Sequence, residues 1–155
     1  MLVQKLFFIS KHCDGCRACE TACLEKNSQS QSIFMTKMEQ PSPQARIKVK
    51  KLGNQYWATV CQHCTDSMCV RACMTGAMQY SSEGEVFHNT NKCVGCWMCI
   101  MVCPFGAISP LNEAKKASKC DLCKNEKIPP CVASCSRQAL FYGTPEEYEM
   151  KVAGD

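Results

Sequence analysis

Sixteen cysteines in 155 residues constrain this chain more than any other feature. They form four groups of four along the sequence, called quartets one to four below, and none is left over. The quartets are Cys13, Cys16, Cys19 and Cys23; Cys61, Cys64, Cys69 and Cys73; Cys93, Cys96, Cys99 and Cys103; and Cys120, Cys123, Cys131 and Cys135. Cysteine at about a tenth of all residues indicates a scaffold that its thiols hold together, because the other apolar residues are few for an ordinary core.

The spacing within the quartets indicates what the thiols bind. Quartets one and three read C-x2-C-x2-C-x3-C, and quartets two and four widen the middle gap. The tight spacing is the iron–sulfur signature of bacterial ferredoxins, in which a short loop curls around one face of a [4Fe–4S] cluster. Gly15 and Gly95 precede the second cysteine in the tight quartets and suit this curl, since glycine tolerates a positive φ. His63 and Leu122 stand there in the wide quartets, which predicts that those loops curl differently.

Other uses of the thiols remain open at this point. Zinc accepts four cysteines, but its sites normally join two pairs about a dozen or more residues apart, unlike the compact runs 13–23 and 93–103. The sequence starts with Met1 and carries no recognisable export signal, so we expect no cleavage and a cytoplasmic, reducing environment in which disulfides are rare. A redox-active C-x2-C enzyme would not need quartets. We expect four [4Fe–4S] clusters, with a different cluster at one wide quartet as the remaining option.

The segments between the quartets predict two nested modules in an α+β fold of tandem ferredoxin type. Residues 77–80 and 86–88 predict a hairpin between quartets two and three, so residues 61–103 resemble a complete two-cluster unit. Residues 6–9 and 139–143 predict two strands that pair around quartets one and four. The predicted division is an outer module (residues 1–23 plus 104–143), a connecting loop and hairpin (24–60), an inner module (61–103) and a C-terminal helical tail (144–155). Within it, residues 24–44 predict the loop, residues 45–60 the hairpin, and residues 104–119 a short ribbon. Residues 144–147 predict a capping box with proline at the first helical position, at the start of a helix that ends near residue 152.

The nested arrangement also predicts which cysteines share a cluster. In two-cluster ferredoxins the fourth cysteine of one run binds the other cluster of the same module. The resulting four ligand sets are Cys13, Cys16, Cys19 and Cys135; Cys120, Cys123, Cys131 and Cys23; Cys61, Cys64, Cys69 and Cys103; and Cys93, Cys96, Cys99 and Cys73.

The rest of the sequence predicts neither catalysis nor nucleic-acid binding. There is no phosphate-binding glycine loop and no nucleophile elbow, so we expect no catalytic residue. The formal charge of +4 counts the thiols as neutral, and the lysine-rich stretches offset bound thiolates, so we expect no nucleic acid. No apolar run approaches the roughly 18 residues that span a bilayer, so we expect no direct membrane insertion. His12, His63 and His88 are expected to support the clusters without binding them.

The four quartets in this order resemble the four-cluster, ferredoxin-like electron-transfer subunits of molybdopterin oxidoreductases, formate dehydrogenases, hydrogenases and carbon monoxide dehydrogenases. The resemblance covers roughly residues 5–143, and the segments 61–64, 72–78 and 92–108 look most like the carbon monoxide dehydrogenase subunit. Many relatives have proline after each fourth cysteine, whereas Leu24, Met74 and Ser136 follow three of the four here. The resemblance implies a series of clusters that links a catalytic subunit to a second redox protein.

Three functions follow from these expectations. The favoured function is a non-catalytic electron-transfer subunit, in which electrons hop outer, inner, inner, outer or along a variant of that order. A free soluble polyferredoxin that diffuses between enzymes is the alternative. A redox-sensing module that regulates a partner is a third reading, although four fully ligated clusters exceed what a sensor needs.

Overall fold

Two-stranded antiparallel sheets and short helices build the protein in the computed structural model, which describes residues 4–154. The strand pairs are β1 (Lys5–Phe8) with β8 (Leu140–Gly143), β2 (Lys48–Leu52) with β3 (Gln55–Thr59), β4 (Met78–Tyr80) with β5 (Val86–His88), and β6 (Ser109–Leu111) with β7 (Lys116–Ser118). The α-helices are α1 (Ala18–Lys26), α2 (Met68–Arg71), α3 (Met98–Met101), α4 (Pro130–Ala133) and α5 (Pro145–Ala153), and 3-10 turns span Ser10–His12 and Thr36–Met38. This content confirms the predicted α+β class. Residues 1–3 of the predicted outer module and residue 155 of the tail lie outside the described residues.

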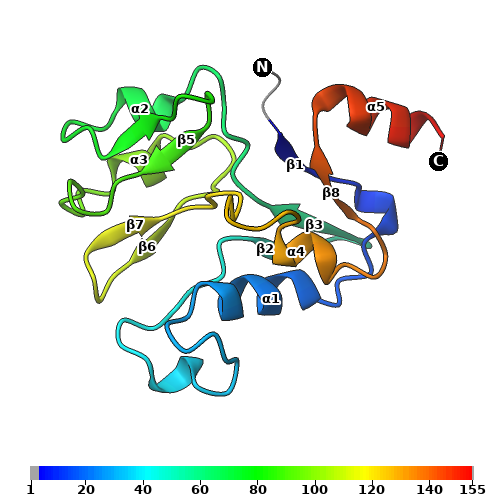
Figure 1. Cartoon of the computed structure of the whole chain (residues 1–155), viewed down its shortest axis with the longest axis horizontal. Coiled ribbons are helices and arrows are strands. Elements are labelled where there is room, and N and C mark those ends of the chain that lie inside the picture. The colour runs from blue at the N-terminus through cyan, green and yellow to red at the C-terminus, as the bar shows by residue number, and fades with distance from the viewer. Residues whose placement is uncertain (1–3, 155) are drawn as a thin grey trace.

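The pairing of β1 with β8 joins the two ends of the chain, as residues 6–9 and 139–143 predict. Leu6 lies opposite Tyr142 and Phe8 opposite Leu140, and both leucines are buried. Figure 1 shows β1, β8 and α5 at one end of the molecule and α2, α3, β4 and β5 at the other. The strands that pair across the whole sequence therefore lie apart from the hairpin formed within residues 78–88.

The predicted hairpin within residues 45–60 is present as β2 and β3, which turn at Gly53 and Asn54. A shorter ribbon, β6 with β7, forms within residues 104–119, also as predicted. The prediction of a loop from residue 24 is wrong at its start, because α1 continues to Lys26. The residues that α1 buries are Cys19 and Cys23, so its inner face lacks the longer apolar stripe by which a helix is predicted from sequence.

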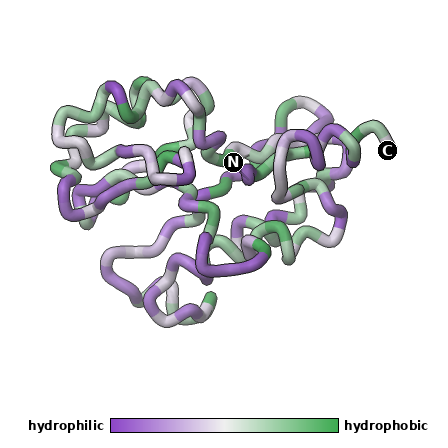
Figure 2. Tube along the Cα trace, turned by 45° about the horizontal axis from the view of Figure 1, so that its top comes forward, coloured by the Kyte–Doolittle hydropathy of each residue, from purple (hydrophilic) through white to green (hydrophobic). Residues whose placement is uncertain are grey.

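Cysteine side chains form a substantial part of the buried interior. One core cluster gathers Leu6, Ile47, Val60 and Leu122 together with the buried cysteines, which are Cys19, Cys23, Cys61, Cys120 and Cys131. A second cluster surrounds Met78, Val86 and Ile108 and includes Cys99. Figure 2 shows hydrophobic stretches that are short and scattered along the trace. Neither core is a continuous apolar layer, so the thiols and whatever they bind complete it.

The tail forms the predicted helix, α5, with the predicted capping box. The Thr144 hydroxyl accepts a hydrogen bond from the Glu147 backbone N–H, and the Glu147 carboxylate accepts one from the Thr144 N–H at 2.8 Å. Proline at the first helical position fits the helix start because its missing N–H needs no partner there. The helix rests on the β1–β8 sheet, where the Phe7 and Tyr148 rings stack with centroids 4.4 Å apart.

Candidate iron–sulfur centres

The third cysteine of every quartet lies in an α-helix. Cys19 lies in α1, Cys69 in α2, Cys99 in α3 and Cys131 in α4. The fourth cysteine follows the helix by a few residues, except that the longer α1 also contains Cys23. The sequence does not reveal these helices, since three of them have only four residues and no apolar period.

All four loops share one backbone feature at the residue before the second cysteine. Gly15 and Gly95 have φ of 76° and 71°, and His63 and Leu122 have φ of 44° and 62°. At this position the wide quartets therefore curl as the tight ones do, against the prediction. The loops do differ one residue after the second cysteine, where φ is positive only in the tight quartets, at Arg17 (59°) and Trp97 (65°). A left-handed φ is unfavourable for histidine and leucine, and tight packing around both side chains, each 1% exposed, holds them there.

The first ligand set predicted for the outer module converges in the structure. Cys13, Cys16, Cys19 and Cys135 line one small cavity between α1 and β8. Burial raises the pKa of the Cys19 thiol to about 12, and the neighbouring Cys135 and Cys13 add to this rise. Cys135 thus faces quartet one, although it lies in quartet four.

The quartet-three set of the inner module converges in the same way. Cys93, Cys96, Cys99 and Cys73 line a second small cavity beside β4 and α3. Burial raises the pKa of Cys99 to about 11, and charges on Cys93, Cys73 and the other neighbouring thiols raise it further. Cys73 therefore reaches across from quartet two.

The two remaining sets lie deeper and meet in the larger core. Burial raises the pKa of Cys61, and nearby Cys103 and Cys64 act in the same direction. Burial also raises the pKa of Cys131 strongly, and Cys120, Cys23 and Cys123 contribute. Cys103 from quartet three thus lies near quartet two, and Cys23 from quartet one lies near quartet four.

Backbone N–H groups donate to several of the thiols. The Arg46 N–H donates to Cys23 Sγ at 3.2 Å, and the Ala77 and Met78 N–H groups donate to Cys73 Sγ at 3.2 and 3.4 Å. Although burial opposes it, these bonds hold the pKa of Cys73 below its ordinary value. Such hydrogen bonds stabilise negative charge on sulfur, and in iron–sulfur proteins they raise the reduction potential.

These sites fit iron–sulfur clusters better than single ions. The donors are all soft thiols, and in residues 4–154 no group of three or more His, Cys, Asp or Glu side chains converges closely enough for one metal ion. The four thiolates of a [4Fe–4S] cluster bind four separate irons, so they lie farther apart than the ligands of one zinc. When bound, such a cluster accepts and releases one electron at a time.

The buried polar side chains near the thiols include His63 and Lys119. Neither ring nitrogen of His63 has a hydrogen-bond partner among residues 4–154, and burial lowers its pKa to about 3. The neutral ring keeps the loop between Cys61 and Cys64 apolar. Lys119 is 3% exposed, and nothing in the sequence distinguishes it from the exposed lysines.

The described residues contain no helix long and apolar enough to cross a membrane.

Cysteines gathered in a frame of small hairpins and helices are typical of an iron–sulfur protein of ferredoxin type. The protein belongs to the 4Fe-4S dicluster domain family, whose profile matches residues 52–144. It is 35% identical to an uncharacterized ferredoxin of Methanocaldococcus jannaschii, over 90% of this sequence and 72% of that protein. It is 33% identical to the B subunit of the anaerobic dimethyl sulfoxide reductase of Escherichia coli, over 97% of this sequence and 78% of that subunit.

A solved structure with a similar fold is found in the active site complex BamBC of benzoyl coenzyme A reductase. The similarity covers 99% of this protein and 89% of the polypeptide that it matches, with a TM-score of 0.51 and 20% sequence identity. At this identity the likeness concerns the fold alone.

Proposed function

We propose that the protein carries electrons through four [4Fe–4S] clusters between a catalytic oxidoreductase subunit and a second redox protein. The observation that carries the proposal is the convergence of thiols from two different quartets at each site. Cys135 lies beside Cys19, and Cys73 lies beside Cys99, which supports an exchange of fourth cysteines within pairs of quartets. A protein with this many soft thiols and no catalytic constellation moves electrons and leaves bond chemistry to a partner.

The ligand sets proposed for the clusters are those that the quartet spacing predicts. They are Cys13, Cys16, Cys19 and Cys135; Cys120, Cys123, Cys131 and Cys23; Cys61, Cys64, Cys69 and Cys103; and Cys93, Cys96, Cys99 and Cys73. The first two sets belong to an outer module (residues 1–23 plus 104–143) and the last two to an inner module (61–103). The pairings of β1 with β8 and of β4 with β5 support this division.

The proximity of the thiols favours one order for the hops. In addition to burial, negative charge on Cys19 raises the pKa of Cys131, so the two outer sets lie close together. Negative charge on Cys69 likewise raises the pKa of Cys99, so the two inner sets lie close together. Cys16 and Cys96 are exposed, whereas Cys61 and Cys120 are buried in one core. The proposed order is therefore outer, outer, inner, inner, with electrons entering and leaving at the sets that contain Cys16 and Cys96.

The nature of the partner rests on the relatives. The similarity to the B subunit of dimethyl sulfoxide reductase favours a reductase complex whose catalytic subunit supplies or consumes the electrons. A carbon monoxide dehydrogenase, formate dehydrogenase or hydrogenase partner, as the sequence resemblance implies, has no support from these relatives and stays a prediction. The cytoplasmic location likewise stays a prediction.

Anaerobic purification of the native complex tests this function. We expect a larger catalytic subunit to co-purify in a fixed ratio, and we expect that subunit's substrate to reduce or oxidise the clusters of this protein. Gel filtration at monomer size with no stoichiometric partner would instead identify a free soluble electron carrier.

A further inference from the structure

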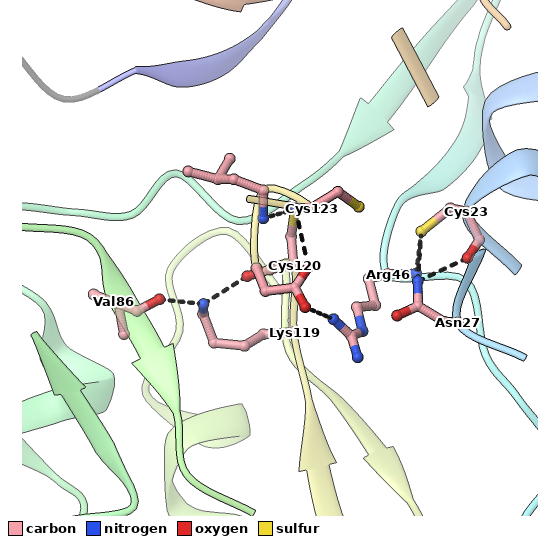
Figure 3. A network of polar contacts seen from close by, with 9 residues as sticks. Cys23, Asn27, Arg46, Val86, Lys119, Cys120 and Cys123 are labelled. Atoms are coloured by element: carbon pink, nitrogen blue, oxygen red, sulfur yellow. Dashed lines mark hydrogen bonds and ion pairs between the residues drawn. The ribbon is translucent and has the colours of Figure 1, made fainter. Parts of the chain in front are cut away.

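Lys119 lies buried at the junction between the two modules. Its Nζ donates to the Val86 carbonyl of β5 at 2.5 Å and to the Cys120 carbonyl at 2.6 Å (Figure 3). Val86 belongs to the inner module and Cys120 to the outer one, so a single ammonium group bridges both. With 3% of its surface exposed, the Lys119 side chain lies in a poorly solvated position.

No carboxylate among the described residues forms an ion pair with Lys119. The two acidic side chains that face the junction have other partners: Asp121 pairs with Arg46 at 2.5 Å, and Glu85 pairs with Lys124 at 2.7 Å. The two carbonyls that Lys119 binds are neutral. An unpaired buried cation is unfavourable by itself, so a compensating negative charge is expected close by.

The thiol sets on both sides of the junction can supply that negative charge. Cys120 directly follows Lys119, which donates to its carbonyl, and Cys61 and Cys120 pack in one buried cluster. Through its bond to the Val86 carbonyl, the Lys119 ammonium also reaches the inner module, so it lies between the two sets. Lys119 therefore favours negative charge at two neighbouring sets at once.

We propose that Lys119 is a positioning residue that raises the reduction potentials of the two clusters flanking the module junction, those of the Cys61 and Cys120 sets. This inference rests on the proposed function and its ligand sets. A reduced cluster carries one more negative charge than an oxidised one, so a fixed cation stabilises the reduced form. An electron that enters at either exposed end is then drawn toward the middle of the molecule, where the hop between modules takes place.

A purely structural role would be different. Lys119 would then only hold the Val86 and Cys120 carbonyls together, and its charge would not matter. Glutamine at this position keeps a donor and loses the charge, methionine loses both, and arginine keeps both. The three variants separate charge from hydrogen bonding.

The test is an EPR-monitored redox titration of the complete protein, purified anaerobically, with Lys119→Gln, Lys119→Met and Lys119→Arg. In the Gln and Met variants we expect the ratio of reduced to oxidised cluster to fall about tenfold at fixed potential for two of the four clusters. For a one-electron couple, this change corresponds to a reduction potential about 59 mV lower. The other two clusters should change much less, and Lys119→Arg should titrate like the unmodified protein.

Lys116→Met is the matched control. Lys116 is part-buried, and its Nζ donates to the Cys93 carbonyl at 2.5 Å, so it lies beside one terminal set only. The loss of Lys116 should lower the reduction potential of one cluster and leave the potentials of the two clusters at the junction unchanged.

The outcomes are distinguishable. If the unmodified protein holds about sixteen irons and the Gln and Met variants titrate unchanged, the inference about Lys119 is wrong and the proposed function stands. If the unmodified protein holds far less iron, the proposed function itself fails. If only Lys119→Arg assembles clusters, the charge serves assembly, and the tuning role is rejected.

Discussion

At the scale of single residues, the position of each thiol follows from the backbone around it. The residue before every second cysteine has a positive φ, whether it is glycine, histidine or leucine. The glycines in the tight quartets were readable as turn formers, whereas His63 and Leu122 were not, because sequence alone does not reveal that packing forces a side chain into a strained region. The exchange of fourth cysteines, in contrast, could be argued from spacing, and it concerns single residues that mutation can test.

Replacing Cys135 with serine tests the exchange. Cys135 shares a cavity with Cys13, Cys16 and Cys19, so Cys135→Ser should damage the cluster of quartet one and spare that of quartet four. After anaerobic purification, EPR should report one altered or missing cluster. Alkylation followed by mass spectrometry should find newly reactive Cys13, Cys16 and Cys19. Newly reactive Cys120 and Cys123 would contradict the assignment.

A substitution at Gly95 tests whether the close approach of the quartet-three loop to the β6–β7 turn matters. A Cβ at Gly95 would lie 2.5 Å from the Lys115 carbonyl oxygen, and the residue has φ of +71°. Gly95→Ala should therefore lower the iron content and the unfolding temperature. Gly106→Ala is the control, because Gly106 has φ of +59° but a Cβ there meets nothing within 4 Å. The control substitution should lower the free energy of unfolding by about 1–2 kcal/mol through backbone strain and leave the iron content unchanged. Equal losses in both variants would show that the contact is unimportant.

At the scale of elements, hairpins were predictable and the cysteine helices were not. The alternation in residues 45–60 and the turn signals around residues 81–85 indicated hairpins, and β2–β3 and β4–β5 are present. Helices α2, α3 and α4 have four residues each, too few for a helical period. Helix α5 was predictable from its first turn, since Thr144, Pro145 and Glu147 mark a helix start that local chemistry stabilises.

The capping box of α5 provides a prediction at this scale. Thr144→Ala removes the side-chain acceptor for the Glu147 N–H and should destabilise the helix start by about 1 kcal/mol. Hydrogen exchange of the backbone amides of residues 146–153 should then be about five times faster. Glu149→Ala, an exposed change on the same helix, is the control and should leave the exchange near its original rate. Unchanged exchange in Thr144→Ala would mean that packing on Phe7, and not the cap, holds α5.

At the scale of the whole molecule, thiols take the place of a conventional hydrophobic interior. The two buried clusters contain six cysteines between them, Cys19, Cys23, Cys61, Cys120, Cys131 and Cys99. The cysteine count indicated this, and the nested pairing of distant strands could be argued from the order of the quartets. The burial of Lys119 at the junction could not be predicted from the sequence, because it depends on the contact between β5 and the Cys120 loop in the folded protein.

Exposure predicts the order in which the clusters are lost. Cys16 and Cys96 are exposed and Cys61 and Cys120 are buried, so a chelator should reach the two terminal sets first. During limited chelation, alkylation should label Cys16 and Cys96 early and Cys61 and Cys120 late. Simultaneous labelling of all four would contradict the proposed placement of the clusters along the molecule.

Counting iron and acid-labile sulfide in the anaerobically purified protein tests the central claim most directly. Four [4Fe–4S] clusters predict about sixteen irons and about sixteen sulfides per polypeptide, with EPR signals that develop on reduction. About four zinc ions and no sulfide, or thiols joined as disulfides, would contradict the account.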